Sequence, residues 1–159
     1  MDAVDRKILA ELERDGRLTL TELSARVQLS LSPCHRRLHA LEDSGAIRGY
    51  RAVVDPDAIG LTFEAIVFAT LERGDRPTVS GFEGALAGIP QVLQAQRLFG
   101  EPDYLLRVVA PDLPTFQQQY DLQLSTLPGL RRLTSTIVMK TVVDHRPLPS
   151  LSDVAASLR

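Results

Sequence analysis

A run of imidazole and guanidinium side chains between residues 35 and 39 has the clearest capacity for chemistry in this sequence. If the segment is helical, at about 100° per residue, His35, Arg36 and His39 share one side and Arg37 lies on its flank. A guanidinium can donate two hydrogen bonds to O6 and N7 of a guanine, while its neighbours hold phosphates. Solvated residues on an ordinary surface helix would show the same pattern, so the surrounding elements must decide.

The segment that carries these side chains is predicted to be a helix. Ser32 can cap its N-terminus, and Pro33 is tolerated at the first helical position because an N–H there has no partner. The apolar residues that recur at i, i+4 and i+7 on the other side are Cys34, Leu38 and Leu41. A helix with a narrow apolar side and a basic outward side is suited to insertion into a DNA major groove.

Two further helices are predicted before this one. The first spans residues 3–15, with Asp2 as its cap and Gly16 as a left-handed exit. The second starts at the capping box Thr19–Glu22 and ends near Val27. A bracing helix followed by two short helices with a tight turn between them is typical of a helix-turn-helix domain.

Residues 47–54 have a strand-like composition, which predicts a wing or a connecting strand after the third helix. Its two arginines are available to hold phosphates, although solvated strand residues would look the same. The predicted DNA-facing residues are Ser32, Pro33, His35, Arg36, Arg37, His39, Arg48 and Arg51.

The second half of the chain predicts alternating strands and helices. The expected order is strand 64–71, helix 79–87, strand 92–99, strand 104–110, a helix capped by Asp112, and strand 134–143. This order is that of a ferredoxin-like α/β sandwich with both helices on one face of the sheet. Strands this apolar need cover on the other face as well, and a second copy of the chain is the simplest cover.

Composition excludes several classes of protein. Eighteen basic and twenty acidic residues give a net charge of −2, so attraction to DNA must come from local placement. One cysteine rules out a disulfide framework, and there is neither a signal-peptide pattern nor an apolar run long enough to span a membrane. We therefore expect a cytoplasmic protein.

Catalysis and metal binding are not expected. The sequence contains no glycine-rich phosphate loop, nucleophile elbow or paired catalytic carboxylates, so we predict no enzyme and no cofactor. His35 and His39, at i and i+4, could hold zinc, but no carboxylate or thiol ligand is clearly arranged beside them. His145 is the third residue that could be taken for a metal ligand, and Cys34, on the inner apolar side, is expected to be a packed thiol.

Four segments, in order, make the chain resemble the leucine-responsive/asparagine regulator (Lrp/AsnC) family of transcription factors. They are DRKILAELERDGRLTLTELSARVQLS, SPCHRRLHALEDSGAIRGYRAVVDPDAIG, FGEPDYLLRV and LPGLRRLTSTIVMKTV. The resemblance implies an N-terminal winged helix-turn-helix, a linking strand and a ferredoxin-like sensing domain, with dimers that assemble into octamers or related rings. It divides the chain into residues 1–45, 46–60, 61–145 and a tail, 146–159.

The resemblance also implies a small effector, an amino acid or a similar molecule, between dimers near residues 100–103 and 134–136. Asp103 could receive an α-ammonium, and hydroxyl and N–H groups of the threonine-rich segment could hold a carboxylate. The candidate ligand residues are Gly100, Glu101, Asp103, Tyr104, Thr134, Ser135 and Thr136. A hairpin turn at residues 100–103 and ordinary strand residues at 134–136, with no ligand, would give the same sequence pattern.

Two departures from the family pattern bear on these expectations. Gln28 stands where relatives often carry glycine, which would cost up to about 1 kcal/mol if that position needs a positive φ. Glu101 and Pro102 stiffen the sensor loop and add a negative charge, which puts the usual effectors in doubt.

The favoured hypothesis is a sequence-specific regulator that binds double-stranded DNA as a homodimer or larger assembly and responds to an effector. The first alternative is an architectural DNA-binding protein of the same fold without an effector. A ferredoxin-like enzyme with a helical appendage is a third, which the missing catalytic constellation disfavours.

Overall fold

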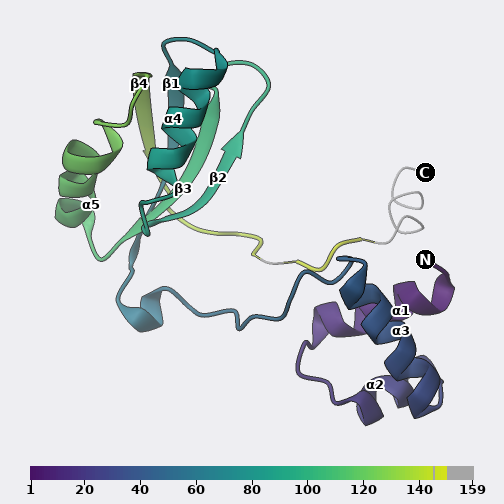
Figure 1. Ribbon diagram of the computed structural model, residues 1–159. Helices are drawn as coiled ribbons and strands as arrows, with labels where there is room; N and C mark the ends of the chain where they lie inside the picture. The colour runs from purple at the N-terminus through teal and green to yellow at the C-terminus, as the bar shows by residue number, and fades with distance from the viewer. Residues whose placement is uncertain (145, 150–159) are drawn as a thin grey trace, which may run out of the picture. The chain divides into compact units, whose positions relative to one another are not determined.

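The computed structural model describes residues 1–144 and 146–149, and the chain divides into two units (Figure 1). Residues 54–142 form one unit, and residues 1–53 belong to the other. Expectations for His145 and for most of the predicted tail fall outside the described residues.

The N-terminal unit contains three helices: α1 (Ala3–Arg14), α2 (Leu20–Val27) and α3 (Leu31–Asp43). Both predicted caps are confirmed: the Asp2 carboxylate accepts from the N–H groups of Val4 and Asp5, and Thr19 forms a capping box with Glu22. The buried core of this unit consists of Ile8, Leu23, Val27, Cys34 and Leu41. The helix-turn-helix prediction is thereby confirmed.

Helix α3 starts earlier than predicted. Its N-cap is Ser30 rather than Ser32, without a side-chain cap bond, and its first intrahelical bond runs from the Cys34 N–H to the Ser30 carbonyl. Pro33 is therefore the third helical residue, where an N–H would still have had no intrahelical acceptor. Gly16 does not supply the predicted left-handed exit from α1. The C-cap of α1 is Asp15, which has an extended backbone. In the turns that join the three helices, the residue with a positive φ is Gln28, at 59°.

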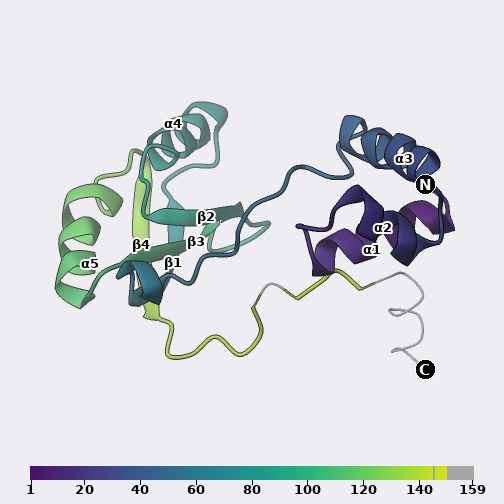
Figure 2. The same cartoon turned by 90° about the horizontal axis from the view of Figure 1, so that it is seen from below.

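The predicted strand over residues 47–54 is absent. Figure 2 shows the segment after α3 as an irregular trace interrupted by a 3-10 turn at Asp57–Ile59. A strand needs a neighbour to satisfy its backbone groups, and within the described chain this segment has no strand partner. Its strand-like composition therefore produces no strand in the single chain.

The second unit is an antiparallel sheet with strand order β2-β3-β1-β4. Its strands are β1 (Phe63–Leu71), β2 (Val92–Arg97), β3 (Tyr104–Ala110) and β4 (Leu130–Ile137). Its helices are α4 (Arg76–Leu86) and α5 (Leu113–Gln119), the latter continued by a π-helical turn at Tyr120–Leu124. The predicted ferredoxin-like order and topology are confirmed.

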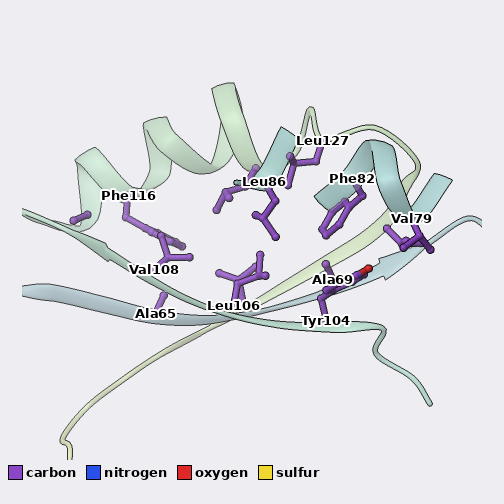
Figure 3. Close-up of a cluster of buried hydrophobic side chains, with 14 residues drawn as sticks. Ala65, Ala69, Val79, Phe82, Leu86, Tyr104, Leu106, Val108, Phe116 and Leu127 are labelled. Atoms are coloured by element: carbon purple, nitrogen blue, oxygen red, sulfur yellow. The ribbon is translucent and has the colours of Figure 1, made fainter. Parts of the chain in front are cut away.

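One face of the sheet is covered by the two helices. Figure 3 shows Phe82 and Leu86 from α4 and Phe116 from α5 pointing onto Leu106 and Val108 of β3. These side chains are nearly or fully buried, and at about 25 cal/mol per Å² their burial is the main favourable term for this unit. The core therefore lies on the helical side of the sheet.

Three elements of this unit have bounds that differ by two residues or more from prediction. Helix α4 starts a turn earlier, because Asp75 caps it and accepts from the Thr78 N–H. Strand β2 ends at Arg97 instead of residue 99, since the chain turns through Gly100 at φ 118°. Strand β4 spans Leu130–Ile137 instead of 134–143: its pairing with β1 runs from Leu130 to Ile137, and beyond Ile137 only the Val138 N–H continues it, donating to the Glu64 carbonyl.

No helix within the described residues has the length and apolar character to cross a membrane.

Candidate DNA-facing helix and candidate ligand loop

Helix α3 has the two sides that its sequence predicts. Cys34 and Leu41 are buried against α1 and α2, and burial raises the pKa of the Cys34 thiol. His35, Arg36 and His39 are exposed on the outward side, as is Ser32, while Pro33 is half-buried. The exposed set is thus presented to solvent by a helix whose other side is held in the core.

Arg37 has a different environment from its basic neighbour Arg36. Its guanidinium lies 2.7 Å from Asp2 Oδ2 and 2.7 Å from Asp5 Oδ1, which are the residues of the α1 capping box. Backbone hydrogen bonds, and after them Arg37, lower the pKa of both carboxyls. Arg37 therefore joins α3 to the start of α1, a contact that the sequence pattern did not reveal.

A chain of polar contacts runs along the exposed side of α3. Nε2 of His35 and Nε2 of His39 are 3.0 Å apart, and Nδ1 of His39 lies 3.2 Å from Glu42 Oε2. The Tyr50 hydroxyl donates to Glu42 Oε1 at 3.0 Å, and burial followed by this hydrogen bond raises the pKa of Tyr50 to about 12. The segment after α3 is thereby attached to the helix at Tyr50, which lies in sequence between the exposed Arg48 and Arg51.

The loop between β2 and β3 is fixed by its own polar groups. Asp103 Oδ2 accepts from the Leu71 N–H at 2.8 Å, and the Asp103 carbonyl accepts from the Leu98 N–H at 2.7 Å. Glu101 Oε1 accepts from Arg131 at 2.7 Å, across to the start of β4. The loop is therefore tied to the ends of two strands.

The other candidate ligand residues do not converge on this loop within one chain. Tyr104 is buried on the helical side, and its hydroxyl donates to Glu83 Oε1 at 2.8 Å; burial and that carboxylate raise its pKa to about 12. Thr134, Ser135 and Thr136 are exposed along edge strand β4, opposite Phe68, Val67 and Ile66 of β1. Thr134 lies three residues beyond Arg131, or about 10 Å along a strand.

Two residues that the sequence interpretation did not single out stand at this end of the sheet. Phe99, next to Gly100, is fully exposed, and Arg131 bridges to the loop through Glu101. The sequence predicts Phe99 as the last residue of the strand 92–99, so its exposure was not expected. An exposed aromatic at a loop tip is a common feature of contact surfaces.

The sheet face opposite the helices is mixed in character. Ile66 and Phe68 of β1 and Leu105 of β3 are half-buried there. Beside them Arg107 makes a bidentate ion pair with Glu64, with both N–O distances 2.8 Å. This set of five residues is called the open face below.

Comparison with known proteins covers both units. A family model described as the Lrp/AsnC ligand binding domain matches residues 64–148, and one described as winged helix-turn-helix DNA-binding matches residues 1–48. The leucine-responsive regulatory protein of Rhizobium meliloti is 36% identical, over 91% of this chain and 92% of that protein. The DNA-binding transcriptional activator DecR of Escherichia coli K12 is 35% identical, over 94% and 98%.

Solved structures are also similar to this chain over most of its length. A transcriptional regulator from Neisseria meningitidis, in complex with L-Met, superposes with a TM-score of 0.88 at 36% identity, covering 94% of this chain and 96% of its own. A feast or famine regulatory protein from M. tuberculosis, complexed with L-methionine, gives 0.85 at 31% identity, covering 92% and 97%.

Proposed function

This chain belongs to the Lrp/AsnC family of DNA-binding transcriptional regulators, and from that premise we propose that it recognises specific DNA through the exposed side of α3 and responds to an amino-acid effector. The observation that carries the DNA part is the division of α3. Arg37 fixes the helix to α1, which leaves Arg36 outward between two imidazoles. Ser32, Pro33, Arg48 and Arg51 are proposed as flanking contacts.

The test of the DNA part measures the affinity of Arg36→Ala and of the parent protein for an operator sequence and for its single-base variants. Binding is followed by fluorescence anisotropy at fixed salt. If Arg36 bonds a guanine, its loss weakens operator binding by about 1–3 kcal/mol and relaxes discrimination at one base pair. Arg17→Ala, an exposed arginine outside α3, is the matched control. Equal weakening on every sequence would contradict base recognition and make Arg36 a phosphate contact.

We propose that the open face is covered by a second copy of the chain. It holds apolar side chains at the centre of a four-stranded sheet whose other face already carries the core. A symmetric dimer buries the same patch on both copies, and two DNA-binding units then reach two half-sites. Assembly beyond the dimer, to an octamer, is an extension that sedimentation velocity on the full chain would test.

The proposed effector is an amino acid held near residues 100–103. Two structural neighbours were solved with methionine, which supports this class of ligand. Asp103 has one oxygen engaged by Leu71, but a carboxylate has lone pairs for further donors such as an α-ammonium. Because Thr134–Thr136 and the loop do not converge in one chain, a complete site would need residues of a second chain.

A thermal-shift screen of the twenty amino acids tests this part. A ligand at 100 times its Kd stabilises the folded state by about 2.7 kcal/mol. Asp103→Asn should abolish the response to a true effector, while Asp121→Asn, an exposed carboxylate on the π-helical turn, should leave it intact.

An effector-independent architectural role is the second candidate. It is favoured by two observations: Tyr104 is buried in the core, and the Asp103 carboxylate already accepts a hydrogen bond from the Leu71 N–H at the end of β1. No amino acid would then shift the melting temperature, and the protein would coat long DNA with little preference for sequence.

A further inference from the structure

We propose that His35 and His39 form a chelating site for a divalent transition-metal ion of the nickel or copper class on the exposed side of α3. The two Nε2 atoms are 3.0 Å apart on successive turns of one helix. The rings meet edge to face, with centroids 4.3 Å apart, and both side chains are exposed to solvent.

The separation of the two nitrogens selects the class of metal. With metal–nitrogen bonds of about 2.1 Å, two nitrogens 3.0 Å apart subtend about 90° at the metal. That angle suits the square-planar, tetragonal or octahedral arrangements of Cu²⁺ and Ni²⁺ better than the tetrahedral arrangement of zinc. Magnesium and calcium are excluded because they prefer oxygen ligands.

Glu42 supplies the orienting contact that metal-binding histidines usually have. Its carboxylate lies 3.2 Å from His39 Nδ1, so the Nδ1 proton is held there and Nε2 keeps its lone pair. The Tyr50 hydroxyl, donating to the other Glu42 oxygen, fixes the carboxylate in turn. This is the carboxylate partner that the sequence pattern did not place beside the histidines.

The binding step balances without any redox change. The direction of the contact between the two Nε2 atoms depends on the tautomers. With the His39 Nδ1 proton directed at Glu42, His35 is the donor, and when the metal binds, the His35 Nε2 proton moves through solvent to His35 Nδ1. Both Nε2 lone pairs then coordinate the ion, and water fills its other positions. Within the described residues no cluster of three or more histidine, cysteine or carboxylate ligands is found, so the site relies on two protein ligands.

The test is isothermal titration of the full chain with NiCl₂ at pH 7.5, with MgCl₂ as a comparison. We expect one saturable Ni²⁺ site per chain and none for Mg²⁺. His35→Ala and His39→Ala should each weaken binding on the order of 100-fold, because each leaves a single imidazole. Glu42→Ala should weaken it on the order of 10-fold, through loss of the orienting contact.

His145→Ala is the matched control, since it removes the third histidine of the chain and should leave the affinity unchanged. Circular dichroism of each variant checks that the helices persist, as expected for exposed positions. Paramagnetic broadening of the imidazole NMR signals by Cu²⁺ provides a second readout, and it should affect the His35 and His39 rings together. Unchanged affinity in either His35→Ala or His39→Ala, or loss of binding in His145→Ala, would overturn the proposal.

Discussion

Arg37 and Asp5 form a 2.7 Å ion pair that joins α3 to the first turn of α1, although thirty-two residues separate them in sequence. The same guanidinium also reaches Asp2, the N-cap of α1. The helix proposed to recognise DNA is therefore anchored at the N-terminus of the bracing helix, where backbone N–H groups already favour negative charge.

Replacing Arg37 by alanine should lower the melting temperature of the N-terminal unit, because two carboxylates lose their cationic partner. The loss should shrink at high salt, since the pair is partly exposed. Backbone hydrogen bonds first, and Arg37 second, lower the pKa values of Asp2 and Asp5, so the Arg37 contribution is present above their unfolded-state pKa and is lost as pH falls through the folded-state value. Melting curves from pH 2 to 7 at two salt concentrations measure both effects, and a salt-independent loss would contradict the ion-pair explanation.

Replacing Gln28 by glycine should stabilise the protein by up to about 1 kcal/mol. Gln28 ends α2 in the left-handed conformation, at φ 59° and ψ 45°, which glycine adopts without steric penalty. Urea unfolding followed by circular dichroism measures the change. Gln28→Ala retains a Cβ and serves as the control, which should show no such gain.

Replacing Gly129 by alanine should destabilise the sheet unit by about 2 kcal/mol or more, because the position combines a positive φ with a close neighbour. At φ 69° a Cβ would collide with Cγ2 of Thr78 on α4. Adding Thr78→Ser, which removes that methyl group, should restore part of the loss. Gly84→Ala, in open space on the same helix, is the control and should stabilise slightly. Additive effects of the two substitutions at 78 and 129 would argue against the collision.

Replacing Tyr104 by phenylalanine should remove about 1 kcal/mol of stability, through the lost hydrogen bond to Glu83. The pKa of Tyr104 is raised to about 12, so the phenol's contribution is complete below its unfolded-state pKa and disappears as pH rises through the folded-state value. In denaturant titrations between pH 9 and 12, the parent should lose stability more steeply than the variant. Parallel curves would show that Tyr104 is not the titrating group.

The order of elements was predictable from the sequence because apolar periodicity and caps are local signals. Strand β3, for example, was predicted with both of its ends correct. Strand β4 was not: it starts four residues before and ends six residues before the predicted bounds, because those bounds depend on its pairing with β1, which is a property of the assembled sheet. The strand expected at residues 47–54 failed for the same reason, as composition alone does not supply a neighbour.

The candidate sites show a similar limit. Helical periodicity correctly separated the buried Cys34 from the exposed Arg36, because both positions follow from one helix. It placed Arg37 on the flank of the helix, but it could not identify the partners of Arg37, which come from α1. Likewise, the sequence joined Asp103 and Tyr104 in one predicted site, whereas Asp103 lies in the loop and Tyr104, the first residue of β3, is buried on the helical side of the sheet.

The ion pair between Glu64 and Arg107 has a consequence for any molecule that settles on the open face. Both charges are already matched within one chain, by two contacts of 2.8 Å. A partner surface that binds here therefore needs no charged residue opposite the ion pair. It can contact Ile66 and Phe68 with apolar side chains while the ion pair stays intact. Replacing Arg107 alone would leave the Glu64 carboxylate without this cation beneath that contact, so association should be more sensitive to Arg107→Gln than to the paired replacement of both residues.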